Sequence, residues 1–419
     1  MDTLYVYFNG DFAGILTKEN KNISFTYDNL YAEKTTTLPL SASLPKQKES
    51  FSSDITESFF QSLLPDEGIK KAIARILQTD ETNTFRILEE LGGDCAGAIY
   101  FSKKQLDTNY SLQHEYRKVN DEDAYTILSS LKKRPLYIGE EDFRVSGAGA
   151  QSKLVACIFD NTLHLPLNGT PSTHIIKPNI DGYENTTYNE LFCMKLARLC
   201  GLETPECFIK TLNREPYYVV ARYDRELIGT NYTRIHQEDF CQALGILPEN
   251  KYESDGGPSL KDCFNLLQKI GISGKGKIDF LDRIIFNYLI GNTDAHGKNF
   301  SILYKNRKAE LAPCYDLLCT EIISPFYNNG EHNKVKMAMK LGSKKYMISK
   351  VTRENFEKLT DISGFRKDYI LKRVDAMCKK IIPNAKLLRD SLNEHSNTES
   401  PVYTEIIALM QKHVEIISL

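Results

Sequence analysis

Gly291-Asn-Thr-Asp-Ala-His-Gly-Lys-Asn-Phe300 places an aspartate, Asp294, five positions before an asparagine, Asn299. The residues before this stretch carry apolar side chains at helical spacing, at Phe280, Leu281, Ile284, Ile285, Tyr288 and Leu289. This pattern predicts a helix with one buried face that stops at Gly291. The two polar residues therefore lie on a loop that leaves a rigid element.

An aspartate and an asparagine at this spacing form the arrangement of a kinase catalytic loop, and these residue types suit phosphoryl transfer. That reaction needs a carboxylate beside the acceptor hydroxyl and oxygen ligands for the Mg²⁺ that bridges the phosphates. We expect Asp294 to be the catalytic base and Asn299 to be a metal ligand. The alternative is that both are ordinary turn residues that bond to their own backbone.

A second candidate metal ligand follows in the chain. The segments Phe300–Tyr304 and Leu311–Tyr315 flank the polar turn 305–308, so they predict a β-hairpin whose second arm ends on Asp316. Folding the hairpin back brings Asp316 near Asn299. The result is a ligand set made of oxygen atoms, as Mg²⁺ prefers.

Composition and charge narrow the class of protein. The chain has 419 residues, 41% of them hydrophobic, which is enough for two or three domains with a sizeable core. Its formal net charge of −2 gives no basic field that would hold DNA, so we expect any DNA contact to be indirect, through a partner. The ten cysteines show no paired short spacing and predict reduced, buried thiols. We see neither a leader nor an apolar run of membrane-spanning length, and we expect a cytoplasmic protein without membrane contact.

The pattern along the chain predicts three parts, at 1–110, 123–225 and 226–419. The first begins with an antiparallel meander over 4–27, with a turn at Asn9-Gly10, and continues with helical periodicity over 57–78 and 84–91. The third is mostly helical. The overall class is α+β.

The middle part carries a set of nucleotide-binding candidates in a meaningful order. A loop of small residues, whose backbone N–H groups can approach phosphates, precedes a strand at 153–159; its members are Ser146, Gly147, Ala148, Gly149 and Ala150. A short strand then ends on Lys177, which is placed to pair with phosphates, and a helix over 187–200 bears Glu190, which is placed to hold Lys177. A second hairpin leads to a hinge with the expected adenine contacts Ala221, Arg222 and Tyr223. A plain tight turn, a solvated lysine and a surface glutamate are the alternatives.

These segments resemble the HipA-like serine/threonine kinases of bacterial toxin–antitoxin systems. The resemblance rests on 39–41, 59–66, 146–153, 174–177, 251–258 and the Asp294 loop, in one order over nearly the whole chain. It implies a protein-kinase-like two-lobe fold with a small additional N-terminal α+β subdomain and a mostly helical C-lobe. It also implies use of ATP with Mg²⁺, and a helix-turn-helix antitoxin partner of the HipB type that binds operator DNA.

The resemblance also implies roles for single residues. Asp294 matches the catalytic base, Asn299 and Asp316 the metal ligands, and Lys177 the phosphate-binding lysine. Ser146 matches a regulatory autophosphorylation site, where a dianion would repel ATP. The implied substrate is an aminoacyl-tRNA synthetase such as the glutamyl enzyme, whose phosphorylation arrests growth.

Two departures from the wider kinase pattern stand out. Asn292-Thr293 replaces His-Arg, and Tyr315-Asp316-Leu317 replaces Asp-Phe-Gly. The arginine that captures a phosphorylated activation loop is therefore missing, and control should use another switch. Within the loop, His296 and Lys298 are candidate contacts to the γ-phosphate, with exposed hydrogen-bonding residues as the alternative.

Two other functions stay open at this point. One is a catalytically weak nucleotide-binding co-repressor that acts on DNA with an antitoxin. The other is a kinase of small molecules, since such enzymes share an aspartate loop followed by a metal ligand. The Ser146 segment and the N-terminal subdomain favour a protein substrate.

Overall fold

The computed structural model describes residues 2–106, 113–324, 330–331, 334–342, 347–396 and 400–418. Its contacts divide the chain into two compact units. The first unit comprises 1–178, 210–249 and 302–308, and the second comprises 179–209, 250–301 and 309–419. The expected boundary between 110 and 123 falls partly on residues outside the described ranges, and the three-part division stays a proposal.

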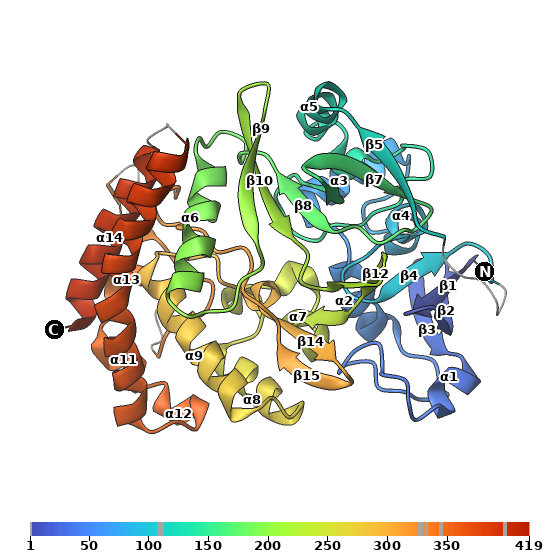
Figure 1. Cartoon of the computed structure of the whole chain (residues 1–419). Helices are drawn as coiled ribbons and strands as arrows, with labels where there is room; N and C mark the ends of the chain where they lie inside the picture. The colour runs from blue at the N-terminus through green and yellow to red at the C-terminus, as the bar shows by residue number, and fades with distance from the viewer. Residues whose placement is uncertain are drawn as a thin grey trace. The chain divides into compact units, whose positions relative to one another are not determined.

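The first unit opens with a four-stranded antiparallel sheet in the order β3-β2-β1-β4 (Figure 1). The strands are β1 (Asp2–Phe8), β2 (Asp11–Glu19), β3 (Asn22–Tyr27) and β4 (Ile99–Ser102). Phe8 pairs with Asp11, and the two residues between them, Asn9 and Gly10, have positive φ angles of 49° and 91°. A two-residue hairpin of this kind needs such angles, which Asn-Gly adopts readily. The predicted meander is confirmed.

Four helices lie between β3 and β4 in the chain, and the first of them is the short α1 (Asn29–Glu33). The predicted helix over 57–78 is wrong, because the structure has α2 (Ser53–Ser62) and α3 (Glu67–Ile76) with a break between them. Pro65 lies in the break, where it cannot donate a helical N–H bond. The fourth helix, α4 (Thr84–Leu91), has its N-terminus capped by the side chain of Asn83, which accepts from the N–H of Arg86.

A six-stranded sheet forms the other half of the first unit, in the order β5-β7-β6-β8-β10-β9. Its strands are β5 (Glu115–Val119), β6 (Leu154–Phe159), β7 (Thr162–Leu167), β8 (His174–Lys177), β9 (Cys207–Leu212) and β10 (Glu215–Ala221). Helix α5 (Asp121–Ser130) follows β5. The glycine-rich loop immediately precedes β6, and Lys177 ends β8, which is the neighbour of β6. The order of strand, lysine strand and hairpin predicted from sequence is confirmed.

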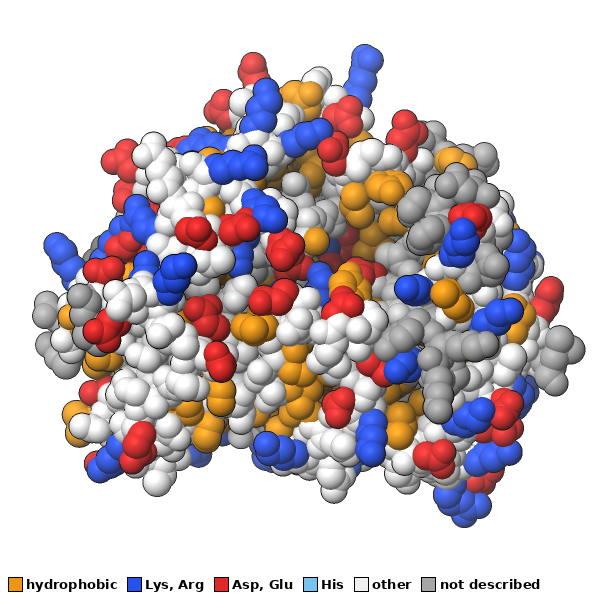
Figure 2. All heavy atoms as spheres, turned by 180° about the vertical axis from the view of Figure 1, so that it is seen from behind, with side chains coloured by type: hydrophobic (Ala, Val, Ile, Leu, Met, Phe, Trp, Pro, Cys, Tyr) orange, Lys and Arg blue, Asp and Glu red, His pale blue; other side chains and the backbone are white. Residues whose placement is uncertain are grey.

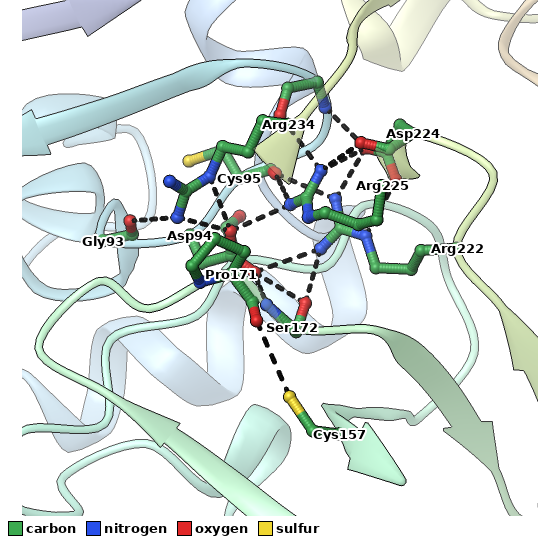
Figure 3. A network of polar contacts seen from close by, with 12 residues as sticks. Gly93, Asp94, Cys95, Cys157, Pro171, Ser172, Arg222, Asp224, Arg225 and Arg234 are labelled. Atoms are coloured by element: carbon green, nitrogen blue, oxygen red, sulfur yellow. Dashed lines mark hydrogen bonds and ion pairs between the residues drawn. The ribbon is translucent and has the colours of Figure 1, made fainter. Parts of the chain in front are cut away.

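A buried ion-pair cluster holds the segment that follows β10, where the sequence predicts a hinge. The carboxylate of Asp94 accepts hydrogen bonds from the guanidinium groups of Arg222, Arg225 and Arg234 and from the hydroxyl of Ser172 (Figure 3). Burial by itself raises the pKa of Asp94, but the three guanidinium groups outweigh it and hold that pKa far below its usual value. The cluster thereby ties the segment that precedes β4 to Ser172, before β8, and to the chain that follows β10.

The same cluster holds the base of a hairpin formed by β11 (Arg225–Ile228) and β12 (Asn231–Arg234). Arg225 and Arg234 are partners in the strand register, and both bond to Asp94 Oδ1 at 2.8 Å. The hinge therefore continues into a hairpin with a fixed base, which the sequence did not predict.

The second unit is mostly helical. Its main helices are α6 (Thr186–Leu199), α8 (Leu260–Lys269), α9 (Gly274–Leu289), α13 (Lys367–Ser396) and α14 (Pro401–Ser418). Helices α13 and α14 pack against each other and both contact α6 and α9. The side chain of Ser273 caps α9 by accepting from the N–H of Gly276. Helix α9 is buried along most of its length, as its apolar pattern predicts.

The predicted hairpin after the loop is present but shorter. Strands β14 (Ser301–Lys305) and β15 (Lys308–Leu311) form a three-stranded sheet with β13 (His236–Asp239), in the order β13-β14-β15. The second arm ends at Leu311 and does not run on to Tyr315. Pro313 lacks the N–H that a strand would use, so the chain leaves the sheet before Asp316.

The described residues also bear on the expectations from composition. All ten cysteines are buried free thiols, as expected. Acidic and basic side chains are interspersed on the face shown in Figure 2, without a large region of one sign. None of the described helices has the length and apolar character needed to cross a membrane.

Candidate active site

The loop after α9 is held in shape by bonds to the end of that helix. Asn292 donates its N–H to Asn287 O at 2.8 Å and its side-chain amide to Asn287 Oδ1 at 2.8 Å. Asn292 Oδ1 then accepts the N–H of Asp294 at 3.2 Å, and Asp294 O accepts the N–H of His296 at 2.8 Å. Asn292, which stands where conventional kinases have histidine, thus fixes the backbone of the expected catalytic base.

The segment that contains Asp316 packs along this loop. Thr320 accepts the N–H of Thr293 at 2.7 Å, and Gly291 O accepts the N–H of Glu321 at 2.9 Å. At the other end of the loop, the Tyr315 hydroxyl donates to Lys298 O at 2.7 Å. Tyr315 precedes Asp316 and Lys298 precedes Asn299, so this bond joins the chain next to both expected metal ligands.

Asn299 and Asp316 have features that fit a metal site. The Oδ1 atom of Asn299 is buried and has no hydrogen-bond partner among the residues that the structure describes. Such an oxygen is costly to bury unless a ligand, ion or water completes it. Asp316 has a φ of 52°, in the left-handed region that non-glycine residues adopt infrequently and that is enriched at functional sites. A small pocket is lined by Asn299 and by Tyr315 and Leu317, the chain neighbours of Asp316, together with Arg283, Asn287 and Asn292, among others.

The donor set suits Mg²⁺ bound together with a nucleotide. Within the described part of the chain there is no group of three or more His, Cys, Asp or Glu side chains that could hold a metal. Mg²⁺ in kinase sites is bound by one or two protein oxygen ligands and otherwise by phosphates and water. One carboxylate, Asp316, with one amide, Asn299, is compatible with that mode.

The side chains of His296 and Lys298 are buried, which contradicts one of the two expectations for them. The interpretation as exposed hydrogen-bonding residues is wrong, because their exposed fractions are only 6% and 8%. The ring of His296 meets the ring of Tyr252 edge-on, with centroids 5.2 Å apart. Contact of either side chain with a γ-phosphate stays a prediction.

In the first unit, the glycine-rich loop is fixed against the N-terminal segment. Ser146 is buried; its hydroxyl donates to Leu63 O and its N–H donates to Asp94 O. The carbonyl oxygen of Gly149 accepts a hydrogen bond from the N–H of Asp66 at 3.2 Å, and Gly149 itself has a φ of 102°. Ser146, Gly147, Ala148, Gly149 and Ala150 thus form one loop, as predicted, with the serine hydroxyl directed into the protein.

A lysine that the sequence interpretation passed over supports this loop. Lys153 is buried, and its ammonium group donates to Ala148 O at 2.8 Å. The same nitrogen would be 3.1 Å from a Cβ added at Gly149. The signal available in the sequence was a basic residue just after the glycine-rich loop, at the entry to an otherwise apolar strand.

Lys177 and Glu190 are both buried, with exposed fractions of 5% and 2%. Lys177 lies in the first unit, with its ammonium group 5.8 Å from the centroid of the Tyr218 ring, and Glu190 lies on α6 in the second unit. Burial of both charged side chains agrees with roles inside the protein, and the solvated alternatives are wrong. Their pairing with each other stays a prediction.

The hinge residues have different surroundings. Ala221 is the last residue of β10 and pairs with His174 of β8. Arg222 donates its N–H to Thr173 O at 2.8 Å, and its guanidinium belongs to the Asp94 cluster. Tyr223 donates its hydroxyl to Gln237. Because Arg222 is engaged through both groups, an adenine contact there is left to its carbonyl oxygen.

Two family descriptions match the chain over most of its length. The HipA N-terminal domain matches residues 4–102, and the HipA-like C-terminal domain matches residues 145–385. The chain belongs to the HipA-like family. The second match contains the glycine-rich loop, Lys177, the Asp294 loop and Asp316 within one HipA-like C-terminal domain.

Relatives of this HipA-like chain carry kinase names. The "Putative kinase Y4mE" of Sinorhizobium fredii is 38% identical over 380 residues, which cover 88% of each chain. The serine/threonine-protein kinase toxin HipA of Shewanella oneidensis is 30% identical over 301 residues, which cover 69% of this chain and 68% of the relative.

Among solved structures, HipA in the Shewanella oneidensis complex of HipA, HipB and operator DNA has the same fold. The TM-score is 0.81 at 22% identity, and the match covers 98% of this chain and 96% of that one. The protein-kinase-like fold expected from the sequence is confirmed.

Proposed function

We propose that the chain is an ATP-dependent protein serine/threonine kinase with Asp294 as its catalytic base. The observation that carries the proposal is the loop from Gly291 to Asn299, bonded at both ends to the segment around Asp316. This arrangement provides one carboxylate, that of Asp294, on a loop held by hydrogen bonds. It also provides two further oxygen ligands, Asn299 and Asp316, whose chain neighbours Lys298 and Tyr315 are joined by a hydrogen bond.

In this proposal Asp294 accepts the proton of the substrate hydroxyl as the hydroxyl oxygen attacks the γ-phosphorus and the bond to ADP breaks. Asn299 and Asp316 hold Mg²⁺, which when bound neutralises charge on the phosphates. Lys177 and the backbone of residues 147–150 bind phosphates, and Glu190 orients Lys177. His296 and Lys298 border the phosphates from the catalytic loop.

The proposed regulation is autophosphorylation of Ser146. Because its hydroxyl is buried and donates to Leu63 O, the loop has to leave this position before the hydroxyl can react. A phosphate of charge near −2 does not fit back into the same buried site, since burial of an unpaired dianion is strongly unfavourable. Modification therefore keeps the loop away from the nucleotide and stops activity.

The proposed partner is an antitoxin of the HipB type, since a solved structure with this fold is a complex of HipA with HipB and operator DNA. The net charge of −2 supports DNA contact through that partner. The proposed substrate is a cytoplasmic protein, with an aminoacyl-tRNA synthetase such as the glutamyl enzyme as the first to test, and its phosphorylation would arrest growth.

Incubation of the purified protein with Mg²⁺ and γ-labelled ATP, followed by mass spectrometry, tests the kinase assignment. The proposal predicts phosphate on Ser146 in the wild type and none in Asp294→Asn. The co-repressor alternative, which the HipB–DNA complex makes worth testing, predicts nucleotide binding without label, together with tighter operator binding by the antitoxin. The Asp294→Asn variant, combined with antitoxin and DNA, separates the two.

A further inference from the structure

The segment that precedes α8 is folded so that Tyr252 faces the catalytic loop. Tyr252 O accepts the N–H groups of Asp255 and Gly257, at 3.0 and 2.8 Å. A Cβ at Gly257 would lie 2.2 Å from Asn250 O, so the tight turn requires glycine there. The backbone at Tyr252 is therefore closely constrained.

Tyr252 bonds directly to the proposed base. Its hydroxyl donates to Asp294 Oδ1 at 2.7 Å, and its half-buried ring packs edge-on against His296 at an interplanar angle of 85°. The neighbouring Lys251 O accepts the N–H of Gly297 at 3.3 Å. The segment thus contacts the catalytic loop at the aspartate side chain, at a ring and at the backbone.

The other side of the same segment is also supported. Glu253 donates its N–H to Ala338 O at 3.1 Å, and its carboxylate accepts the N–H of Lys340 at 2.6 Å. Ala338 in turn donates its N–H to Thr293 O at 2.8 Å, next to Asp294. Tyr252 is therefore held between the catalytic loop and residues 338–340, both of which restrict its movement.

We propose that Tyr252 is a positioning residue for Asp294, an inference that rests on the proposed kinase function. A phenol that donates to a carboxylate makes a charge-assisted bond, which fixes the plane of the carboxylate. A carboxylate has several acceptor sites, so this bond leaves it able to take the proton of the substrate hydroxyl. Tyr252 thereby sets the direction from which Asp294 receives that proton.

The same hydrogen bond has a second interpretation, in which the phenol occupies the place of the acceptor hydroxyl and is itself phosphorylated. The tight turn at Gly257 and the contact with His296 oppose this, because an acceptor must approach and leave while Tyr252 is held at several points. Removal of the Tyr252 hydroxyl should lower kcat if the phenol positions Asp294. It should leave kcat unchanged or raise it if the phenol occupies the place of the acceptor.

The test uses the full-length protein and Tyr252→Phe, which removes one oxygen and keeps the ring. We expect kcat for phosphate transfer to a peptide or protein acceptor to fall about tenfold, as for loss of a hydrogen bond to a charged group, with KM for ATP unchanged. Tyr31→Phe is the matched control, since the Tyr31 hydroxyl donates at 2.8 Å to a backbone carbonyl, that of Leu38, in the first unit. The control should retain wild-type kcat.

Other outcomes overturn the inference. An unchanged or higher kcat in Tyr252→Phe, a proportional rise in KM for ATP, or phosphate on Tyr252 in the wild type would each contradict a positioning role. Asp294→Asn, measured alongside, keeps the proposed function separate. If that variant transfers phosphate normally, the kinase assignment fails; if it is inactive while Tyr252→Phe behaves as wild type, only the role of Tyr252 fails.

Discussion

The hydroxyl of Tyr315 donates to the carbonyl oxygen of Lys298 at 2.7 Å and is also within 2.6 Å of the Ser301 hydroxyl. Each partner of the first bond is the chain neighbour of a proposed metal ligand, Asp316 or Asn299. One phenol therefore sets the spacing between the two segments that are proposed to hold Mg²⁺.

Removal of the Tyr315 hydroxyl should raise the Mg²⁺ concentration that phosphate transfer requires, with only a small loss of unfolding free energy. We expect Tyr315→Phe to raise the Mg²⁺ concentration for half-maximal phosphate transfer by roughly three- to tenfold and to cost about 1 kcal/mol of unfolding free energy. A Mg²⁺ titration at saturating ATP measures the first effect and urea denaturation the second. If Tyr315→Phe titrates like the wild type, Tyr315 does not set this spacing.

The lysine beneath the glycine-rich loop should affect nucleotide binding. Lys153→Met removes the donor to Ala148 O but keeps a side chain of similar length. We expect KM for ATP to rise several-fold because the loop is less well ordered. Lys210→Met is a suitable control, since that lysine also donates to a backbone carbonyl, Asn161 O, but outside the candidate site. Equal KM values for the two variants would contradict the assignment of Lys153.

Asp94 should be essential for the fold. Asp94→Asn removes a buried carboxylate that pairs with three guanidinium groups, of which Arg222 and Arg225 keep Asp224 as a partner. Loss of one partner of a buried ion pair typically costs about 3–5 kcal/mol. We expect a large drop in the melting temperature. Asp390→Asn, at an exposed pair with Arg389, should change it little. Similar melting temperatures of the two variants would show that the cluster contributes little.

Glu238 predicts an unusual dependence of stability on pH. Burial raises the pKa of Glu238 to about 7, against the lowering effect of hydrogen bonds from Ser41, Tyr304 and the N–H of Ala42. Its ordinary value is 4.5, so between pH 4.5 and 7 the folded state binds more protons than the unfolded state. This group's contribution therefore falls as pH rises through that window, by up to about 3 kcal/mol.

Glu238→Gln removes this titration. We expect the unfolding free energy of the wild type, relative to Glu238→Gln, to decrease from pH 5 to pH 8. Urea denaturation at several pH values measures the difference. A difference that is constant or that rises with pH would mean that Glu238 is ionised in the folded protein throughout the range.

Much of this structure follows from local sequence. Asn9-Gly10 predicts its hairpin because few other residues adopt two positive φ angles, and the apolar face of α9 predicts a buried helix ending before the Asp294 loop. The break at Pro65 and the short arm before Pro313 were missed, because periodicity continues through a proline that the backbone does not tolerate.

The rest depends on contacts distant in sequence. Tyr252 meets Asp294 from 42 positions away, and Arg234 meets Asp94 from 140 positions away. A single sequence contains the residues but not these pairings. For the same reason the burial of Ser146, His296 and Lys298 was not predicted, since polar residues in loops are exposed more often than not.

The central claim is that Asp316 and the Asp294 loop transfer phosphate. The most direct measurement is transfer of label from γ-labelled ATP by purified Asp316→Ala at saturating Mg²⁺ and ATP, beside the wild type. The account predicts a folded variant with no detectable transfer, because charge neutralisation of the phosphates is indispensable. A melting curve beside the wild type checks that the variant is folded. Wild-type rates in that variant would contradict the account.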